Sequence, residues 1–293
     1  MSPGSSVQLV ESAPAKVNLT LRVLGRRGDG YHEIESLVAF AEFGDQLRFS
    51  PGGELMLAIN GPMAAKAGDA ESNLVLKAAR EMAARHSGLK LGAFSLDKRL
   101  PVAAGLGGGS ADAAAALRLI VQANGLTSDD PALYAAAGAT GADVPVCLDP
   151  RPRVMRGIGE ILSEPLTLPA LPAVLVNPGV AVPTREVFAK WATVSSPSPP
   201  AEYAGLGAQP THEVLLQFLL AQPNDLERPA IALAPLIADV LAALRDGAGC
   251  RLARMSGSGA TCFGLYVSPA AAEKAATALR GKFPNWWVRA TML

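Results

Sequence analysis

The sequence predicts an α+β fold with two domains, and three observations support this prediction. Residues 6–59 alternate apolar and polar side chains, as antiparallel strands do. After residue 73, segments with helical periodicity alternate with short apolar runs bounded by Gly and Pro. The 293 residues are 49% hydrophobic and 18% charged, enough to form one large or two ordinary domains. Strands mixed with helices in this order favour layers of helix packed on sheet.

The predicted elements follow from these periodicities. Strands are expected at 6–24, 32–43, 46–49, 54–59, 94–100, 146–148, 173–177, 251–266 and 286–290, with more than one strand in the first range and in 251–266. Helices are expected at 73–86, 111–124, 130–137, 183–191, 212–220, 230–245 and 269–280. Ser72 is the expected N-cap of the first helix, and the Asp129-Asp130 pair caps the third, before Pro131.

The composition shifts after residue 149 towards proline-rich loops with short strands. We therefore predict one domain over residues 1–162 and a second over residues 163–293. Residues 193–210 are rich in Ser, Pro, Gly and Ala, and they are expected to be a surface loop of low order.

Charge and composition exclude several classes of protein. The 26 basic and 26 acidic residues cancel, so the chain has no electrostatic footprint for nucleic acid. No apolar run reaches the length of a membrane span and no signal-like segment opens the chain, which favours the cytoplasm. Cys147, Cys250 and Cys262 form no CxxC pair and are expected to be reduced core residues. A monomer and a homodimer are both compatible with the sequence.

A glycine-rich turn dominates the first half of the chain. Gly105, Leu106, Gly107, Gly108, Gly109 and Ser110 lie between a strand-like run and an alanine-rich helix. Glycines let a ligand approach the backbone, and the start of a helix offers free N–H groups and a positive dipole end to an anion. A plain turn with an N-cap at Ser110 is the alternative, but so many glycines favour phosphate binding.

Two familiar nucleotide motifs do not fit this turn. The Walker pattern is absent from the chain. The dinucleotide fingerprint would require a third glycine where Ser110 stands. The turn is therefore expected to be a phosphate cradle of another kind.

Further residues carry possible chemistry. Lys16 and Asn18 are two apart in a strand and therefore share a face, although strand lysines often only extend to solvent. Asp143 is a lone acid in a small-residue loop, where it could simply bond its own turn. Beside a lysine it would stay ionised and could accept a hydroxyl proton. Tyr31 and His32 follow a turn and are candidates for stacking on a base.

These motifs, taken in order, resemble the GHMP kinase superfamily, small-molecule kinases without a Walker loop. The segments that carry the resemblance are 14–19 (Pro-Ala-Lys-Val-Asn-Leu), 28–32 (Gly-Asp-Gly-Tyr-His), 97–111, 141–145 (Gly-Ala-Asp-Val-Pro), 157–160 and 256–260 (Ser-Gly-Ser-Gly-Ala). Each motif is moderately specific, and their joint order and spacing are highly specific. The resemblance extends over about residues 16–264 of the chain.

The resemblance implies a ribosomal S5 domain 2-like N-terminal domain and a ferredoxin-like C-terminal domain. It also implies ATP as donor, with Mg²⁺, and the 2-hydroxyl of 4-diphosphocytidyl-2-C-methyl-D-erythritol, a precursor in non-mevalonate isoprenoid synthesis, as acceptor. By this analogy Asp143 is the general base and Lys16 its cationic neighbour. Residues 105–110 with Asn73 and Lys98 would bind ATP. The residues implied on the acceptor side are Asn18, Tyr31, His32, Thr184 and Phe188, with Tyr31 and Phe188 enclosing the cytosine.

Other interpretations fit less well. A homoserine or mevalonate kinase would have no base for Tyr31 and His32 to stack on. A binding protein without catalysis would not need Lys16 and Asp143 together. Two residues depart from the family pattern: Arg156 could contact a phosphate or be a surface charge, and Asp112 beside the cradle should repel phosphate unless a metal or a donor meets it.

Overall fold

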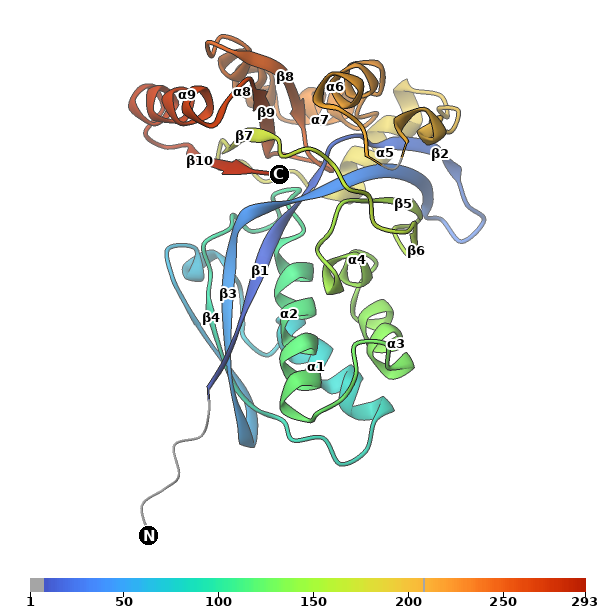
Figure 1. Cartoon of the computed structure of the whole chain (residues 1–293), viewed down its shortest axis with the longest axis vertical. Coiled ribbons are helices and arrows are strands. Elements are labelled where there is room, and N and C mark those ends of the chain that lie inside the picture. The colour runs from blue at the N-terminus through green and yellow to red at the C-terminus, as the bar shows by residue number, and fades with distance from the viewer. Residues whose placement is uncertain (1–7, 208) are drawn as a thin grey trace. The chain divides into compact units, whose positions relative to one another are not determined.

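The computed structural model of the chain describes residues 8–207 and 209–293 (Figure 1). Val7 of the first predicted strand and Ala208 of the predicted loop lie outside the described residues. The described residues form two compact units, which combine helices with sheet as the sequence predicts. The first unit comprises residues 8–15, 44–102 and 107–150, and the second comprises 16–43, 103–106 and 151–293.

Strand β3 (His32–Asn60) takes the place of three predicted strands, those at 32–43, 46–49 and 54–59. In the first unit, residues 46–50 pair with β4 (Gly92–Asp97) in descending register. Residues 56–60 pair with the same β4 residues in ascending register. The chain therefore reverses near residues 51–53 and flanks β4 on both sides.

The first unit packs its helices around α2. Its helical elements are η1 (Ala64–Lys66), α1 (Leu74–Arg85), α2 (Gly108–Ala123), α3 (Pro131–Thr140) and α4 (Val144–Leu148). Residues 111–117 of α2 are all buried, because alanine side chains let neighbouring elements approach closely. Helices α1, α3 and α4 contact α2, and Figure 1 shows α1 and α2 side by side.

Helix α4 contradicts the strand predicted at 146–148. A short apolar run such as Val-Pro-Val-Cys-Leu has no periodicity that separates a strand from a buried helix. Pro145 lies in the first turn of α4, where its missing N–H costs nothing. Packing against α2 and α3 then decides for the helix.

The second unit contains two groups of strands. Strand β1 (Leu9–Asn18), like β3, contributes residues to both units. Strands β2 (Arg22–Arg26) and β5 (Arg153–Gly157) pair antiparallel with the 32–38 part of β3, and β6 (Ile161–Leu162) pairs with β5. A separate antiparallel sheet has the order β10-β7-β9-β8. Its strands are β7 (Pro172–Asn177), β8 (Cys250–Met255), β9 (Cys262–Tyr266) and β10 (Trp287–Met292).

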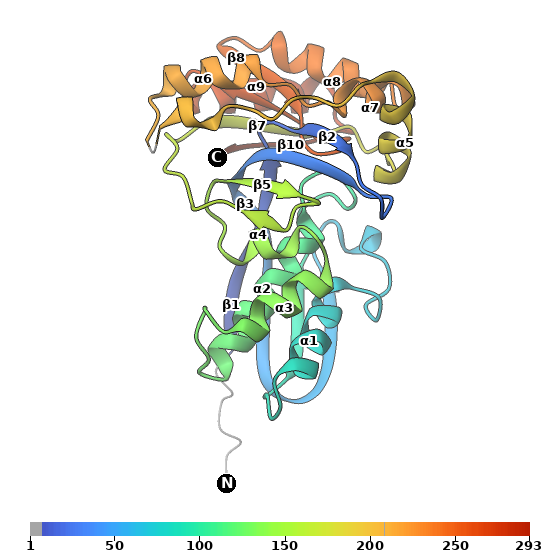
Figure 2. The same cartoon turned by 90° about the vertical axis from the view of Figure 1, so that its right-hand side faces the viewer.

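The second unit also contains helical elements. They are α5 (Thr184–Val194), η2 (Tyr203–Leu206), α6 (His212–Ala221), α7 (Glu227–Leu233), α8 (Leu236–Arg245) and α9 (Pro269–Lys282). Figure 2 shows α8 and α9 along the sheet, and both contact its strands. The core between them includes Val174, Val176, Leu241 and Leu279.

The single helix predicted at 230–245 is wrong, because α7 and α8 divide it. Ala234 leaves the helical region, with φ −138° and ψ 83°. Pro235 follows it, and a residue before proline is sterically disfavoured in the helical conformation. The apolar periodicity continues across the break, which is why the sequence pattern did not indicate it.

Residues 198–201 make hydrogen bonds to β2 and β3. The Ser198 N–H donates to the Val23 carbonyl at 2.9 Å, and Arg22 Nη1 donates to the Pro199 carbonyl at 2.6 Å. The Ala201 N–H donates to Glu35 Oε1 at 2.6 Å. Residues 195–202 form the predicted loop without regular secondary structure, and β2 and β3 supply its hydrogen-bond partners.

The helices in the described part of the chain are all too short or too polar to cross a membrane. Cys147 and Cys262 are buried, as expected of core residues, and Cys250 is half-buried.

Candidate active site

The first turn of α2 contains Gly108, Gly109 and Ser110 of the segment predicted to bind phosphate. Gly107 is the N-cap, in the left-handed conformation with φ 60° and ψ 19°. The first N–H to bond back is that of Ala111, which donates to the Gly107 carbonyl at 2.8 Å. The N–H groups of Gly108, Gly109 and Ser110 therefore have no acceptor within the helix and can serve an anion.

Ser110 is not the N-cap that the sequence predicted. The helix begins three residues earlier than expected, because Gly107 can adopt a positive φ without the steric cost that a Cβ carries. Ser110 consequently lies within the first turn, among the residues whose N–H groups face the helix start.

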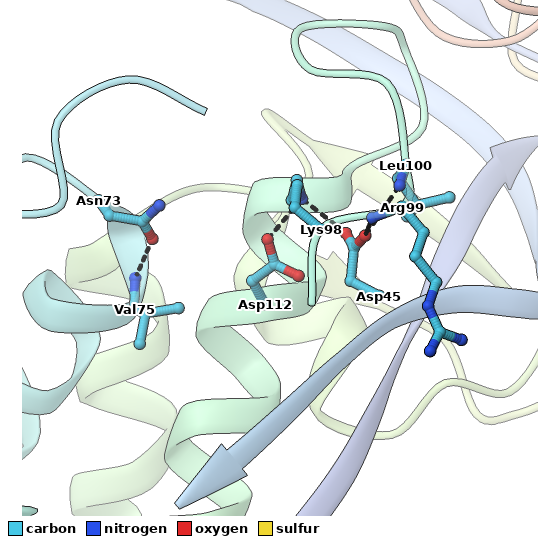
Figure 3. Close-up of polar contacts among 7 residues, drawn as sticks. All are labelled: Asp45, Asn73, Val75, Lys98, Arg99, Leu100 and Asp112. Atoms are coloured by element: carbon cyan, nitrogen blue, oxygen red, sulfur yellow. Dashed lines mark hydrogen bonds and ion pairs between the residues drawn. The ribbon is translucent and has the colours of Figure 1, made fainter. Parts of the chain in front are cut away.

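Lys98 lies in a buried cluster with Asp45 and Asp112, here named the Lys98 cluster (Figure 3). Lys98 Nζ donates to Asp45 Oδ2 at 2.6 Å and to Asp112 Oδ2 at 2.5 Å. All three residues are at most 4% exposed. The other Asp45 oxygen, Oδ1, accepts the N–H groups of Arg99 and Leu100. Because of these bonds, β4 ends at Asp97 rather than continuing to Leu100 as predicted.

Burial and charge shift the ionisation of this cluster. Burial raises the pKa of Asp112 to about 8; Lys98 opposes that shift and Asp45 adds to it. For Lys98, burial would lower the pKa, but the charges of Asp112 and Asp45 outweigh it, so the pKa is raised. The sequence suggested that Asp112 would need a metal or a hydrogen-bond donor beside the glycine-rich turn. Lys98 of the same unit is that donor.

Asn73 is the N-cap of α1, the helix beside α2. Its Oδ1 accepts the N–H of Val75 at 3.0 Å (Figure 3). The cap predicted at Ser72 is wrong by one residue: Ser72 Oγ instead donates to the Asp69 carbonyl at 3.0 Å. Asn73 thus lies at the start of a helix that packs on the cradle helix.

Asp143 is the N-cap residue of α4, with φ −87° and ψ −4°. Its side chain makes no capping hydrogen bond to α4, whose Val144 N–H instead donates to the Gly141 carbonyl at 3.0 Å. Asp143 therefore stands at the start of α4, in the small-residue loop that the sequence indicated.

Gly105 of the glycine-rich turn packs against residues 256–259, and both belong to the second unit. Its φ is 76°, and a Cβ at this position would lie 2.3 Å from the Ser256 carbonyl oxygen. Ser256 Oγ donates to the Gly105 carbonyl at 2.8 Å, and the Thr261 N–H donates to the Ala104 carbonyl at 3.1 Å. Residues 256–261 therefore hold residues 103–106 in place through these hydrogen bonds.

Gly105→Ala is expected to lower both stability and nucleotide affinity. The new Cβ would clash with the Ser256 backbone, and the left-handed conformation alone costs about 1–2 kcal/mol. Gly179→Ala is the matched control, since Gly179 has φ 80° and nothing within 4 Å of the added Cβ. Thermal unfolding and the KM for ATP measure the effect. Equal losses in the two variants would show that close packing at Gly105 is unimportant.

Lys16 and Asn18 lie in β1 and are both buried. The Lys16 N–H donates to the Leu106 carbonyl at 2.9 Å, which attaches β1 to the loop. Asn18 Nδ2 donates to Ser36 Oγ at 2.7 Å, and the Asn18 N–H donates to Ser256 Oγ at 3.0 Å. Strand β1, which carries the predicted catalytic Lys16, is therefore hydrogen-bonded to Leu106 of the glycine-rich turn and to Ser256.

The aromatic residues predicted on the acceptor side partly meet. The rings of His32 and Phe188 stack, with centroids 4.7 Å apart, and His32 makes an edge contact with Trp191 at 5.6 Å. Burial, aided by the charge of Arg26, lowers the pKa of His32, and His32 Nε2 is buried with no hydrogen-bond partner among the described residues. Tyr31 is 61% exposed.

Thr184 and Arg156 have partners within the second unit. Thr184 Oγ1 lies 2.8 Å from Ser258 Oγ. Arg156 Nε donates to Glu35 Oε2 at 2.8 Å, and the Arg156 guanidinium lies 5.8 Å from the centre of the Tyr203 ring. Burial raises the pKa of Tyr203 to about 12. Arg156 therefore holds a buried carboxylate, a third possibility beside the two considered from the sequence.

Sequence reasoning missed the two buried acids Asp45 and Glu35. Each is at most 1% exposed and stands in β3. An acid at a position where β3 should face the core was the available signal.

No group of three or more His, Cys, Asp or Glu side chains that could hold a metal is present among residues 8–207 and 209–293. A magnesium ion that enters with a nucleotide needs few protein ligands, since it keeps several waters and binds phosphate oxygens. The free N–H groups at the start of α2 are compatible with a magnesium ion held mainly by the phosphates of a nucleotide.

Comparison with known families gives two matches. Residues 73–149 match the family described as GHMP kinases N terminal domain, and residues 213–285 match GHMP kinases C terminal.

Curated relatives and solved structures are similar over nearly the whole chain. A 4-diphosphocytidyl-2-C-methyl-D-erythritol kinase of Methylorubrum extorquens is 57% identical, covering 97% of this chain and 99% of the relative. One of Bradyrhizobium diazoefficiens is 52% identical over 97% and 98%. A crystal structure of 4-(cytidine 5'-diphospho)-2C-methyl-D-erythritol kinase aligns with a TM-score of 0.77 at 35% identity, over 97% and 99%. Homoserine kinase from Cytophaga hutchinsonii shares the fold, with a TM-score of 0.72 at 22% identity, over 99% and 96%.

Proposed function

Because the chain belongs to the GHMP kinase family, we propose that it transfers the γ-phosphate of ATP to the 2-hydroxyl of 4-diphosphocytidyl-2-C-methyl-D-erythritol. One observation carries this proposal: relatives 52–57% identical over nearly their full length have the name of that kinase. The reaction would place the chain in isoprenoid precursor synthesis.

The proposed ATP site is the glycine-rich segment with two supporting residues. Backbone N–H groups of residues 105–110, together with the Ser110 hydroxyl, would hold the triphosphate. The unsatisfied N–H groups at the start of α2 and the left-handed Gly107 support this role. Leu106 contributes through its backbone, because its side chain is buried. Asn73 and Lys98 are assigned to the nucleotide from the same unit.

We assign Asp143 as the general base and Lys16 as the catalytic cation. The acceptor oxygen attacks the γ-phosphorus, its proton passes to the Asp143 carboxylate, and the bond from phosphorus to ADP breaks. Phosphoryl transfer depends mainly on alignment and on stabilising charge, so a buried ammonium on β1 suits Lys16 to this role.

The acceptor side is assigned to residues of the second unit. These residues are Asn18, Tyr31, His32, Thr184 and Phe188. The stacked His32 and Phe188 rings offer an aromatic surface for the cytosine, and His32 is assigned to its hydrogen-bonding edge. Tyr31 is exposed and would close on the other face of the base.

Tyr31→Ala is expected to raise the KM for the cytidyl substrate and leave the KM for ATP unchanged. Loss of one aromatic stacking partner corresponds to about 1–3 kcal/mol, by analogy with bases stacked on aromatic side chains. Steady-state kinetics with each substrate varied separately measures both constants. Tyr134→Ala, at an exposed tyrosine of the first unit, is the matched control. An equal rise of both KM values in Tyr31→Ala would place this residue elsewhere.

Other parts of the proposal rest on the sequence and on the resemblance. Mg²⁺ is expected to accompany ATP, held chiefly by its phosphates. Division into residues 1–162 and 163–293 stays a prediction, as do a cytoplasmic location and a monomeric or dimeric state.

A substrate panel tests the proposed function. Purified protein with ATP and Mg²⁺ is offered the cytidyl compound, mevalonate or homoserine, and ADP release is followed. We expect release with the cytidyl compound only. Preferential turnover of mevalonate or homoserine would replace this function by that of another GHMP kinase.

A further inference from the structure

The Lys98 cluster combines one ammonium group with two carboxylates and is almost fully buried. With all three groups ionised it would hold one uncompensated negative charge. Burying a net charge is strongly unfavourable, and a buried group normally changes its protonation state instead. The composition of the cluster therefore calls for one extra proton.

Hydrogen bonding decides which carboxylate takes that proton. Asp45 is satisfied as an anion, because Oδ2 accepts from Lys98 and Oδ1 accepts two backbone N–H groups. Asp112 Oδ2 accepts from Lys98, but Asp112 Oδ1 is buried and has no partner among the described residues. Hydrogen bonds to the charged form favour that form, so the proton belongs on Asp112. The raised pKa of Asp112 agrees with this geometry.

Asp112 also lies next to the first turn of α2, where the phosphates are proposed to bind. It belongs to the second turn of α2, whose first turn offers the N–H groups of residues 108–110. A Cβ on Gly108 would lie 3.3 Å from Lys98 Nζ, so the cluster contacts this turn closely. Negative charge at Asp112 would therefore oppose a polyphosphate bound at the helix start, and a neutral Asp112 would not.

We propose that Asp112 is a proton-switched positioning residue: it is neutral when a nucleotide is bound at the first turn of α2, and its ionisation weakens that binding. This inference rests on the proposed function, since it takes the first turn of α2 as the phosphate site. Asp112 acts through the charge of the cluster, without contact to the nucleotide. Proton uptake on binding is the necessary counterpart of this linkage.

Other charged groups around Asp112 already have partners. Lys77 of α1 donates to the Thr140 carbonyl at 2.9 Å, and Arg99 forms an ion pair with Asp97. Arg118, further along α2, pairs with Glu11. Asp143 and Cys147 belong to α4, which also packs on α2. Besides burial, which is the largest cause, the groups that shift the pKa of Asp112 are Lys98 and Asp45.

The sign of the pH dependence follows. Below the pKa of free Asp112 the cluster is already neutral and binding is strongest. As the pH rises through about 8, binding must take up a proton, and affinity falls. The fall amounts to roughly tenfold for each unit by which the nucleotide raises the pKa of Asp112.

ADP with Mg²⁺ is a suitable probe, because its phosphates stay ionised between about pH 7.5 and 9.5. Isothermal titration near pH 8, in buffers with different ionisation enthalpies, gives the number of protons taken up per ADP. For the wild type we expect a substantial fraction of one proton and an affinity that falls with pH. Asp112→Asn, which mimics the protonated acid, should take up none and should bind equally well across this range.

Asp130→Asn is the matched control, because Asn caps α3 as well as Asp does. It should keep the wild-type profile. No proton uptake by the wild type, or the same uptake in Asp112→Asn, would overturn the proposal while nucleotide binding itself persists. Should Asp112→Asn fail to fold, the wild-type titration alone decides. Failure of the wild type to bind ADP at all would instead contradict the proposed function, and with it this inference.

Discussion

Asp143→Asn is expected to lower kcat by about 10²–10⁴-fold while leaving ATP binding largely intact. Asparagine has nearly the same shape but cannot take the proton of the acceptor hydroxyl. Asp143 stands at the start of the short helix α4, as its N-cap residue. Steady-state ADP release and direct titration with ADP and Mg²⁺ separate the two effects.

The comparison variant for this experiment is Asp130→Asn, another N-cap aspartate of the same unit. It should turn over at the wild-type rate. Near-normal turnover of Asp143→Asn would refute the assignment of a general base, whatever its effect on substrate affinity.

Lys16→Ala is expected to reduce turnover by several-fold to a thousandfold, roughly 1–4 kcal/mol of barrier. The reason is the loss of positive charge that would stabilise the transferring phosphoryl group. Lys16 is also buried, so alanine removes packing as well as charge. The rate constant at saturating concentrations of both substrates is the quantity to measure.

Lys16→Met isolates the charge, since methionine keeps most of the buried stem. A loss as large as that of Lys16→Ala would assign the effect to the ammonium, whereas near-wild-type activity would reduce Lys16 to a packing role. In the double variant with Asp143→Asn, losses that do not add would show that both residues act on one step.

Much of the fold could be predicted from the sequence, because its signals are local. Asp130 before Pro131 marked the start of α3, and the glycines at 105–109 marked the cradle. The sequence signals failed where contacts distant in sequence or a glycine conformation determine the structure. Helix α4 is helical through packing on other helices, and α2 begins after Gly107 rather than after Ser110.

The candidate site divides in the same way. Lys98 and Asp112 were noticed separately in the sequence, but their meeting with Asp45 was not. Asp45 is 53 residues from Lys98 along the chain, and no periodicity connects a strand acid to a lysine at such a distance. The pairing of Glu35 with Arg156, 121 residues away, was hidden for the same reason.

Product analysis by ³¹P NMR tests the central claim most directly, the transfer of phosphate to the 2-hydroxyl. The carbon that bears this hydroxyl is tertiary and has no hydrogen, so its phosphate ester should give a resonance without coupling to a proton on the ester carbon. We expect this singlet to appear together with ADP when the protein is incubated with ATP, Mg²⁺ and 4-diphosphocytidyl-2-C-methyl-D-erythritol. A doublet or triplet, from a phosphate on a secondary or primary carbon, would contradict the account, and so would the absence of a new phosphate ester.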